Sequence, residues 1–206
     1  QEGLSCINSQ MVSSISFSSG GFDAKYGDKM SSVLDIKYRK PQGSAASVSA
    51  SLLGASVHAE HATKNGRFTQ IHGLRYKTSA YLLGSLDTKA EYSPRFFDYQ
   101  TYMTFQINPR LELAFLGNLS KNNYDFRPQS RQTKFGTYNI ARALNVYFDG
   151  WENDEFQTAT GALNLNYRLN NKNLIRFTGS VYNTVEDVAY DILSEYFLNE
   201  LDNQLG

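Results

Sequence analysis

The fold is decided by the stretch RFTQIHGLRYKTSAYLLGSL, residues 67–86, in which apolar and polar side chains alternate. Successive side chains of a β-strand point to opposite faces, so alternation at every second residue predicts a strand with one apolar and one polar face. The apolar parity carries Phe68, Leu74, Tyr76, Ala80, Leu82 and Leu86. The polar parity carries Arg67, Thr69, Gly73, Arg75, Lys77, Ser79 and Ser85. We therefore expect one long strand with two chemically different faces.

Four further segments repeat this alternation. They are residues 96–107, 110–122, 159–169 and 173–185. Tyr102 and Leu116 are exceptions, since both fall on the polar parity of their segments. Residues 47–53 and 56–62 indicate two shorter strands that meet near Gly54. We therefore expect an all-β, antiparallel fold with about seven strands.

The five long segments exceed the length of ordinary soluble strands. A soluble strand typically has about five to six residues, whereas a tilted strand needs roughly 9–11 residues to cross the hydrocarbon core of a membrane. Tight turn sequences at 64–66, 108–110 and 170–173 alternate with longer links at 87–95 and 125–158. Outer-membrane barrels have this asymmetry, with short periplasmic turns and long extracellular loops. The pattern predicts part of a transmembrane β-barrel; the alternative is a soluble antiparallel sandwich, whose strands also have an apolar and a polar face.

Seven strands are too few to close such a barrel. Single-chain bacterial barrels have an even number of strands and at least eight. Residues 190–206 are expected to enter another outer loop. We therefore expect the chain to be the front portion of a longer protein.

Composition and charge narrow the classes of function. Basic and acidic residues balance at 20 each, which leaves no positive field to attract nucleic acid. A single cysteine, Cys6, provides neither a disulfide framework nor a cysteine-built zinc site. His58 and His61 flank Glu60, but residues 58 and 61 of a strand point to opposite faces, so no shared metal ion is expected. No nucleophile–base arrangement is recognisable, and we expect no enzyme activity and no cofactor.

A glycine-bearing stretch, SSISFSSGGFDAKYGDKMSSVLDIKYRKP at residues 13–41, precedes the first of these strands. Its alternating parts, 12–18 and 32–38, predict a compact β element around the connection. The connection carries Gly20, Gly21, Phe22, Ala24, Tyr26 and Gly27. This run, followed by Ser-Val-Leu-Asp-Ile at 32–36, resembles the closing segment of the plug domain of TonB-dependent outer-membrane receptors. Residues 75–79 and 150–154 also resemble early-barrel features of that family.

The resemblance implies a division of the chain and a function. Residues 1–41 would be the C-terminal end of the plug domain, and residues 42–206 the N-terminal strands and loops of a 22-stranded barrel in the outer membrane of a Gram-negative cell. Such a receptor takes up a scarce nutrient by ligand binding and plug gating. Its partners would be the TonB energising complex, outer-membrane lipid, and a surface lipoprotein or other outer-membrane subunit, with no nucleic acid. Two alternatives stay open: a receptor-like barrel that is a structural or assembly partner without transport, and a soluble β-rich binding module.

Candidate site residues follow from parity and from the predicted loops. The polar, lumen-facing parity carries the basic residues Arg75, Lys77, Arg168 and Arg176, which would contact plug carboxylates or an anionic substrate. An interfacial aromatic girdle is predicted at Tyr76, Phe97 and Tyr99, with a sugar-stacking platform as the alternative. An outer-loop ligand surface is predicted at Arg127, Arg131, Trp151, Glu152 and Asp154, because these residues belong to the long link 125–158.

Overall fold

The computed structural model describes residues 7–27, 31–78, 92–137 and 140–201. Its regular elements are β-strands apart from one 3-10 turn, η1 (Ser9–Met11). Every strand pairing given with its register is antiparallel. The expected all-β, antiparallel fold is therefore confirmed. Within the described ranges, no helix is long and apolar enough to cross a membrane.

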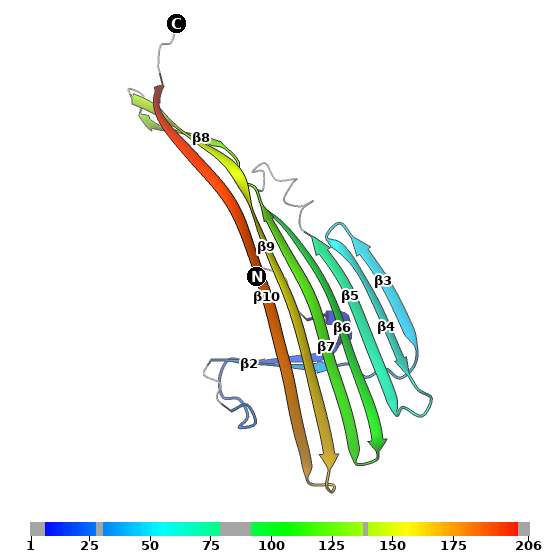
Figure 1. Cartoon of the computed structure of the whole chain (residues 1–206). Coiled ribbons are helices and arrows are strands. Elements are labelled where there is room, and N and C mark those ends of the chain that lie inside the picture. The colour runs from blue at the N-terminus through cyan, green and yellow to red at the C-terminus, as the bar shows by residue number, and fades with distance from the viewer. Residues whose placement is uncertain (1–6, 28–30, 79–91, 138–139, 202–206) are drawn as a thin grey trace. The chain divides into compact units, whose positions relative to one another are not determined.

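The strands form two sheets (Figure 1). The small sheet pairs β1 (Val12–Ser18) with β2 (Val33–Tyr38) and sets Ile15 opposite Ile36. The large sheet has the order β10-β9-β7-β6-β5-β4-β3, and β8 pairs with β9 beside this path. The last strand of the small sheet ends at Tyr38 and the first strand of the large sheet begins at Ala45.

The large sheet contains the strands predicted from alternation. Its members are β3 (Ala45–Ser51), β4 (Gly54–Ala62), β5 (Phe68–Thr78), β6 (Tyr92–Asn108), β7 (Leu111–Phe126), β8 (Arg131–Thr137), β9 (Ile140–Arg168) and β10 (Leu174–Leu201). The seven strands of the main path correspond in order to the seven predicted ones. The tight turns at 64–66, 108–110 and 170–173 join β4 to β5, β6 to β7 and β9 to β10, and they lie at one end of the sheet (Figure 1).

Two predicted loops are wrong. The link 125–158 is almost entirely strand, because β7 continues to Phe126, β8 follows, and β9 starts at Ile140. Residues 190–201 belong to β10 rather than to an outer loop. The link 87–95 is corrected in part, since β6 begins at Tyr92 and the preceding residues lie outside the described ranges. As a result β9 and β10 contain 29 and 28 residues.

The chain divides into two compact units. The first contains Gln1–Lys77, Phe96–Lys121 and Gln157–Thr184, and the second contains Thr78–Arg95, Asn122–Phe156 and Val185–Gly206.

In β5 and β6 of the first unit, one face of the sheet is mainly polar and buried while the other is apolar and exposed. The buried parity of β5 and β6 carries Thr69, Arg75, Asp98, Gln100 and Thr104, and Ile71 joins them. Large exposed side chains on the opposite parity include Leu74, Tyr76, Phe97, Phe105, Phe115, Leu119, Leu163, Phe177 and Val181. A soluble two-faced sheet has the reverse arrangement, with the apolar face against the core and the polar face in water.

Candidate functional site: the contact between the N-terminal segment and the sheet

The buried polar face is covered in part by the N-terminal segment, which we define as the described residues from 7 to 40. Asn8 begins η1 as its N-cap, because its side-chain oxygen accepts a hydrogen bond from the Gln10 amide at 3.1 Å. The Asn8 amide in turn donates to Gln100 Oε1 of β6 at 3.2 Å. Asn8 and Met11 are 1% and 0% exposed. Residues 8–11 are therefore seated against the sheet.

Gly73 of β5 makes this seat possible. A Cβ added at Gly73 would lie 2.2 Å from Asn8 Nδ2 and 3.0 Å from Met11 Sδ. Any larger residue would overlap the segment, so glycine provides close approach of the backbone here. The glycine within β5 is therefore explained by the close approach of Asn8 and Met11.

Arg75 joins the sheet to the segment through a buried ion pair. Its Nε and Nη2 donate to Asp98 Oδ1 and Oδ2 at 2.7 and 2.6 Å, and its Nη1 donates to the Ile7 carbonyl oxygen at 2.9 Å. The side chains of Arg75 and Asp98 are 7% and 1% exposed. Bidentate charge-assisted bonds of this kind are strong and hold one geometry. The guanidinium is thereby positioned to bind the backbone of the N-terminal segment.

The two residues that follow β2 in sequence make a second group of contacts with the large sheet. Arg39 donates to Glu60 Oε2 at 2.7 Å and lies 3.3 Å from His58 Nε2 on β4. Lys40 donates to Glu112 Oε2 of β7 at 2.5 Å. His58 and Glu60 thus share one face, as expected for residues two apart on a strand. Among the described residues, no group of three or more His, Cys, Asp and Glu side chains is placed to hold a metal ion.

The contact that Tyr102 makes explains why this aromatic residue lies on the polar parity of its strand. Its ring stacks on Tyr38, the last residue of β2, with centroids 5.1 Å apart and an interplanar angle of 25°. An aromatic side chain on the polar face of β6 is therefore used to pack the N-terminal segment. Such pairs contribute about 0.5–1.5 kcal/mol beyond the area they bury.

Ion pairs and hydrogen bonds join the N-terminal segment to the large sheet. The segment contributes the cations Arg39 and Lys40, and the sheet contributes the carboxylates Glu60 and Glu112. Hydrogen bonds to Asn8 and to the Ile7 carbonyl complete the contact. Because these contacts are hydrogen bonds and ion pairs, water molecules can take the place of either partner if the segment moves away from the sheet.

The four predicted basic residues differ in their partners and in their exposure to solvent. Arg75 contacts the N-terminal segment as described, through a carbonyl rather than a carboxylate. Arg176 donates instead to Asn166 of the neighbouring strand β9 at 2.9 Å. Lys77 and Arg168 are exposed, and the Arg168 amide bonds to the Arg110 carbonyl. Only Arg75 is thus placed at the contact by a described bond.

The residues predicted to form a plug-end motif lie in the connection between β1 and β2. The Tyr26 hydroxyl donates to Asp35 Oδ2 of β2 at 2.6 Å, which ties the connection to the small sheet. Gly21 has φ 62°, a left-handed conformation that favours glycine. Lys25 lies 4.6 Å from the Tyr26 ring centroid, and its hydrogen bond with Tyr26 raises the pKa of Lys25 above the ordinary value. The remaining residues of the run, Gly20, Phe22, Ala24 and Gly27, lie in the same connection.

The predicted girdle residues lie on the exposed parity. Tyr76 and Phe97 are 43% and 46% exposed, and the Tyr99 hydroxyl bonds to His72 Nδ1 at 2.8 Å. The predicted outer-loop residues, in contrast, are mostly strand residues. Arg131 belongs to β8, Trp151, Glu152 and Asp154 belong to β9, and Arg127 follows β7.

Several residues of the contact were missed by sequence reasoning. Asp98 and Gln100 had the polar parity, which was the available signal for their position. Glu112 had the polar parity of its segment as well. Asn8 and Arg39 carried no signal, because their partners lie far away in sequence; the Asn8–Gln100 bond spans 92 residues. Comparison of the chain with protein families, with curated proteins and with solved structures finds no match.

Proposed function

We propose that this chain is part of a TonB-dependent outer-membrane receptor, in which the N-terminal segment is the end of a plug and the large sheet is the first part of the barrel wall. The receptor binds a scarce nutrient and admits it when TonB-coupled force moves the plug. Its resemblance to this family rests on residues 20–36, and the structure supports the proposal in two ways.

The polarity of the two faces carries the proposal. Leu74 and Tyr76 of β5 are 38% and 43% exposed, whereas Arg75 between them, and Asp98 on the same face of β6, are buried. Each large apolar side chain contributes about 1.5–3 kcal/mol when it is removed from water. A lipid environment would cover the exposed apolar face, and a barrel strand alternates in this way between lipid and lumen.

The polar contact supports gating. A plug that moves needs contacts that hold it at rest and exchange for water when it is pulled. Arg39 and Lys40 are 44% and 49% exposed in their ion pairs with the sheet, so these pairs already border solvent. Partly exposed ion pairs of this kind are worth about 0–1 kcal/mol each, which an applied force can overcome. The buried Arg75–Asp98 pair stays within the wall and offers the segment a single backbone bond.

The test compares cells that express the full-length receptor with cells whose receptor lacks the TonB-binding segment. Both receptors are first located by membrane fractionation, and each culture is then grown in a defined nutrient mixture whose depletion is followed by mass spectrometry. We expect both proteins in the outer membrane and at least one nutrient depleted only by the intact receptor. Equal depletion by both strains would refute energy coupling, and recovery of the intact receptor in a soluble fraction would refute the barrel.

A further inference from the structure

The second unit contains a group of buried polar atoms that the protein leaves unsatisfied. Asn122 Oδ1, the Tyr124 hydroxyl and Asp154 Oδ1 are buried and have no hydrogen-bond partner in the part of the chain that the structure describes. Asn122 and Tyr124 are each 5% exposed. Buried polar atoms are almost always paired, so three such atoms in one place require an explanation.

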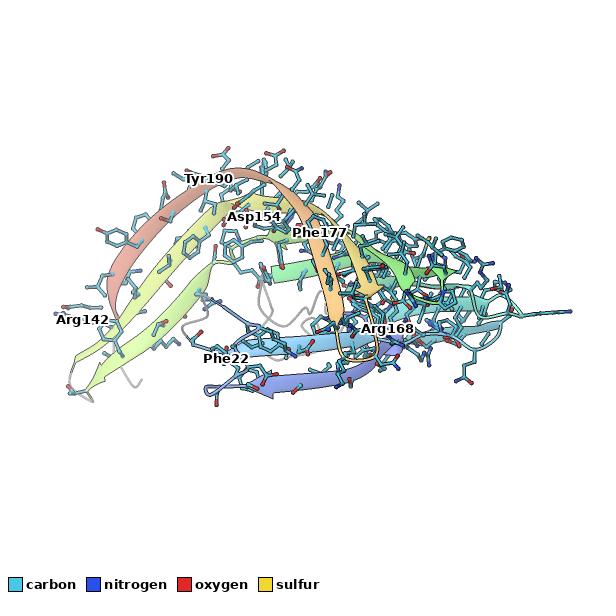
Figure 2. The ribbon with its side chains drawn as sticks, turned by 90° about the horizontal axis from the view of Figure 1, so that it is seen from below. Phe22, Arg142, Asp154, Arg168, Phe177 and Tyr190 are labelled. Carbon is cyan, nitrogen blue, oxygen red and sulfur yellow. The ribbon has the colours of Figure 1, made fainter. Side chains whose placement is uncertain are left out.

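The strand register brings the three side chains together. Asn153 Nδ2 of β9 donates to Asp125 Oδ1 of the neighbouring strand β7 at 2.6 Å, which sets residue 153 opposite residue 125. In an antiparallel pair, Asp154 then lies opposite Tyr124, and residue 156 opposite Asn122. These residues share one face because they differ by two along each strand. Figure 2 labels Asp154 on β9.

Aromatic rings border this group. Tyr92 of β6 stacks on Tyr124 with centroids 5.4 Å apart, and Phe156 meets the Tyr124 ring edge-on at 5.8 Å. The rings exclude water from the oxygen atoms beside them, which strengthens any electrostatic interaction there. An arginine is close in sequence but is used elsewhere, since Arg95 pairs with Asp125 on the opposite parity of β7.

The unsatisfied atoms define the chemistry of a ligand. Asn122 and Asp154 present oxygen acceptors, the Tyr124 hydroxyl can accept as well, and the carboxylate brings a negative charge. Glu152, two residues before Asp154 on the same parity, adds a second negative charge. A primary ammonium group has three N–H donors and a positive charge, and therefore matches three acceptors, a carboxylate and the aromatic rings beside them.

We propose that Asn122, Tyr124 and Asp154 form a binding site for a primary ammonium group. A calcium ion fits less well, because Ca²⁺ takes six to eight oxygen ligands, and no metal-binding group of carboxylates is present among the described residues. A neutral polyol would satisfy the acceptors but leave the buried carboxylate charge uncompensated. The ammonium group can belong to a small amine or to a lysine side chain, and the chemistry of recognition is the same.

Calorimetric titration of the full-length protein in detergent tests the site. The probes are n-butylammonium for a small amine and Nα-acetyl-lysine methylamide for a lysine side chain, with n-butanol, xylose and CaCl₂ as comparisons. We expect an ammonium probe to bind with a dissociation constant of about 1 mM, as suits a ligand of few atoms, and n-butanol at least tenfold more weakly. Tighter binding of the lysine derivative would identify a peptide or protein source, and tighter binding of butylammonium a small-molecule source.

Variants distinguish the site from general attraction to an acidic surface. Asp154→Asn should weaken butylammonium binding at least tenfold, and Tyr124→Phe should weaken it about threefold to tenfold. Asp149→Asn, which removes the same charge from an exposed position of β9, should leave binding unchanged. Asp154→Asn should also raise the thermal midpoint of the ligand-free protein, since it removes a half-buried charge whose Oδ1 atom has no partner among the described residues.

Three results would overturn the proposal. Binding of n-butanol or xylose as tight as that of butylammonium would show that charge is not recognised. Displacement of butylammonium by CaCl₂ at micromolar concentration would show a metal site. Equal losses in Asp149→Asn and Asp154→Asn, or no binding of either ammonium probe at 100-fold the expected dissociation constant, would show that no such site exists. Because binding is measured at equilibrium on purified protein, its failure is independent of whether the receptor takes up a nutrient.

Discussion

Replacement of Asp98 by asparagine should destabilise the large sheet and loosen the N-terminal segment together. The substitution keeps the size of the side chain but leaves the Arg75 guanidinium, 7% exposed, without its carboxylate. Removing one partner of a buried ion pair costs about 3–5 kcal/mol, because an uncompensated charge stays buried. The Arg75 bond to the Ile7 carbonyl depends on the same bidentate geometry, and a charge-assisted hydrogen bond of this kind contributes about 1.5–3 kcal/mol. We therefore expect a loss of at least 3 kcal/mol, with faster exchange of the Asn8 amide.

The assay is urea unfolding of the full-length protein refolded into lipid vesicles, combined with hydrogen exchange on residues 7–11. A matched control is Glu112→Gln, which removes the same charge from the Lys40 pair, where the side chains are 49% and 22% exposed. That pair should be worth about 0–1 kcal/mol. The double variant Arg75→Met with Asp98→Leu removes both charges and should unfold near the wild-type midpoint while the segment still exchanges fast. Equal effects of Asp98→Asn and Glu112→Gln, or a loss below 1 kcal/mol in Asp98→Asn, would refute the reasoning.

Three further substitutions test separate features of the structure. Gly73→Ala places a Cβ 2.2 Å from Asn8 Nδ2 and should cost about 1–3 kcal/mol and expose residues 7–11 to proteolysis, whereas Gly43→Ala, with open space around it, should be neutral. Gly150→Ala places an alanine at φ 118° with its Cβ against a backbone carbonyl of β10, a strained conformation. Hydrogen exchange of the backbone amides in residues 188–193 should therefore accelerate. Unchanged exchange would show that the two strands adjust without strain. Leu113→Arg changes a residue on the proposed lipid-facing parity of β7 and should lower the free energy of unfolding from the membrane by about 2–4 kcal/mol. Less protein should then insert into vesicles, as measured by heat-modifiable migration in gel electrophoresis. Full insertion would contradict the proposed orientation.

Sequence alternation predicted the first unit well because burial there differs between the two faces. In β5 the exposed Leu74 and Tyr76 alternate with the buried Arg75, and the same contrast continues in β6. Apolar and polar residues alternate along a strand when its two faces meet different environments, whichever of the two faces is apolar. The contrast also explains why Tyr102 stood out, since its neighbour is the ring of Tyr38 rather than water or a polar side chain.

Alternation failed where both faces of a strand meet similar surroundings. Residues 149–155 of β9 mix acidic, amide and aromatic side chains, and most are half-buried on both parities. In β10, Tyr190, Leu193 and Tyr196 are all exposed although their parities differ. The residues of these segments do not alternate clearly between apolar and polar, so the segments resembled loops. Their strand conformation depends on pairing with neighbours, which the residues of one strand do not reveal.

Two polar groups of this protein differ in whether the chain satisfies its own buried atoms, and this difference separates a structural role from a binding role. Arg75 donates to Asp98 and to Ile7, and the charge and donors of the guanidinium are matched from within the protein. Asn122, Tyr124 and the half-buried Asp154 each retain a buried oxygen atom without a partner among the described residues. A protein that had no use for those atoms would lose stability by keeping them, because apolar groups of similar shape would fill the space at lower cost. The first group is therefore expected to govern unfolding and segment mobility, whereas the second is expected to govern affinity for an ammonium ligand.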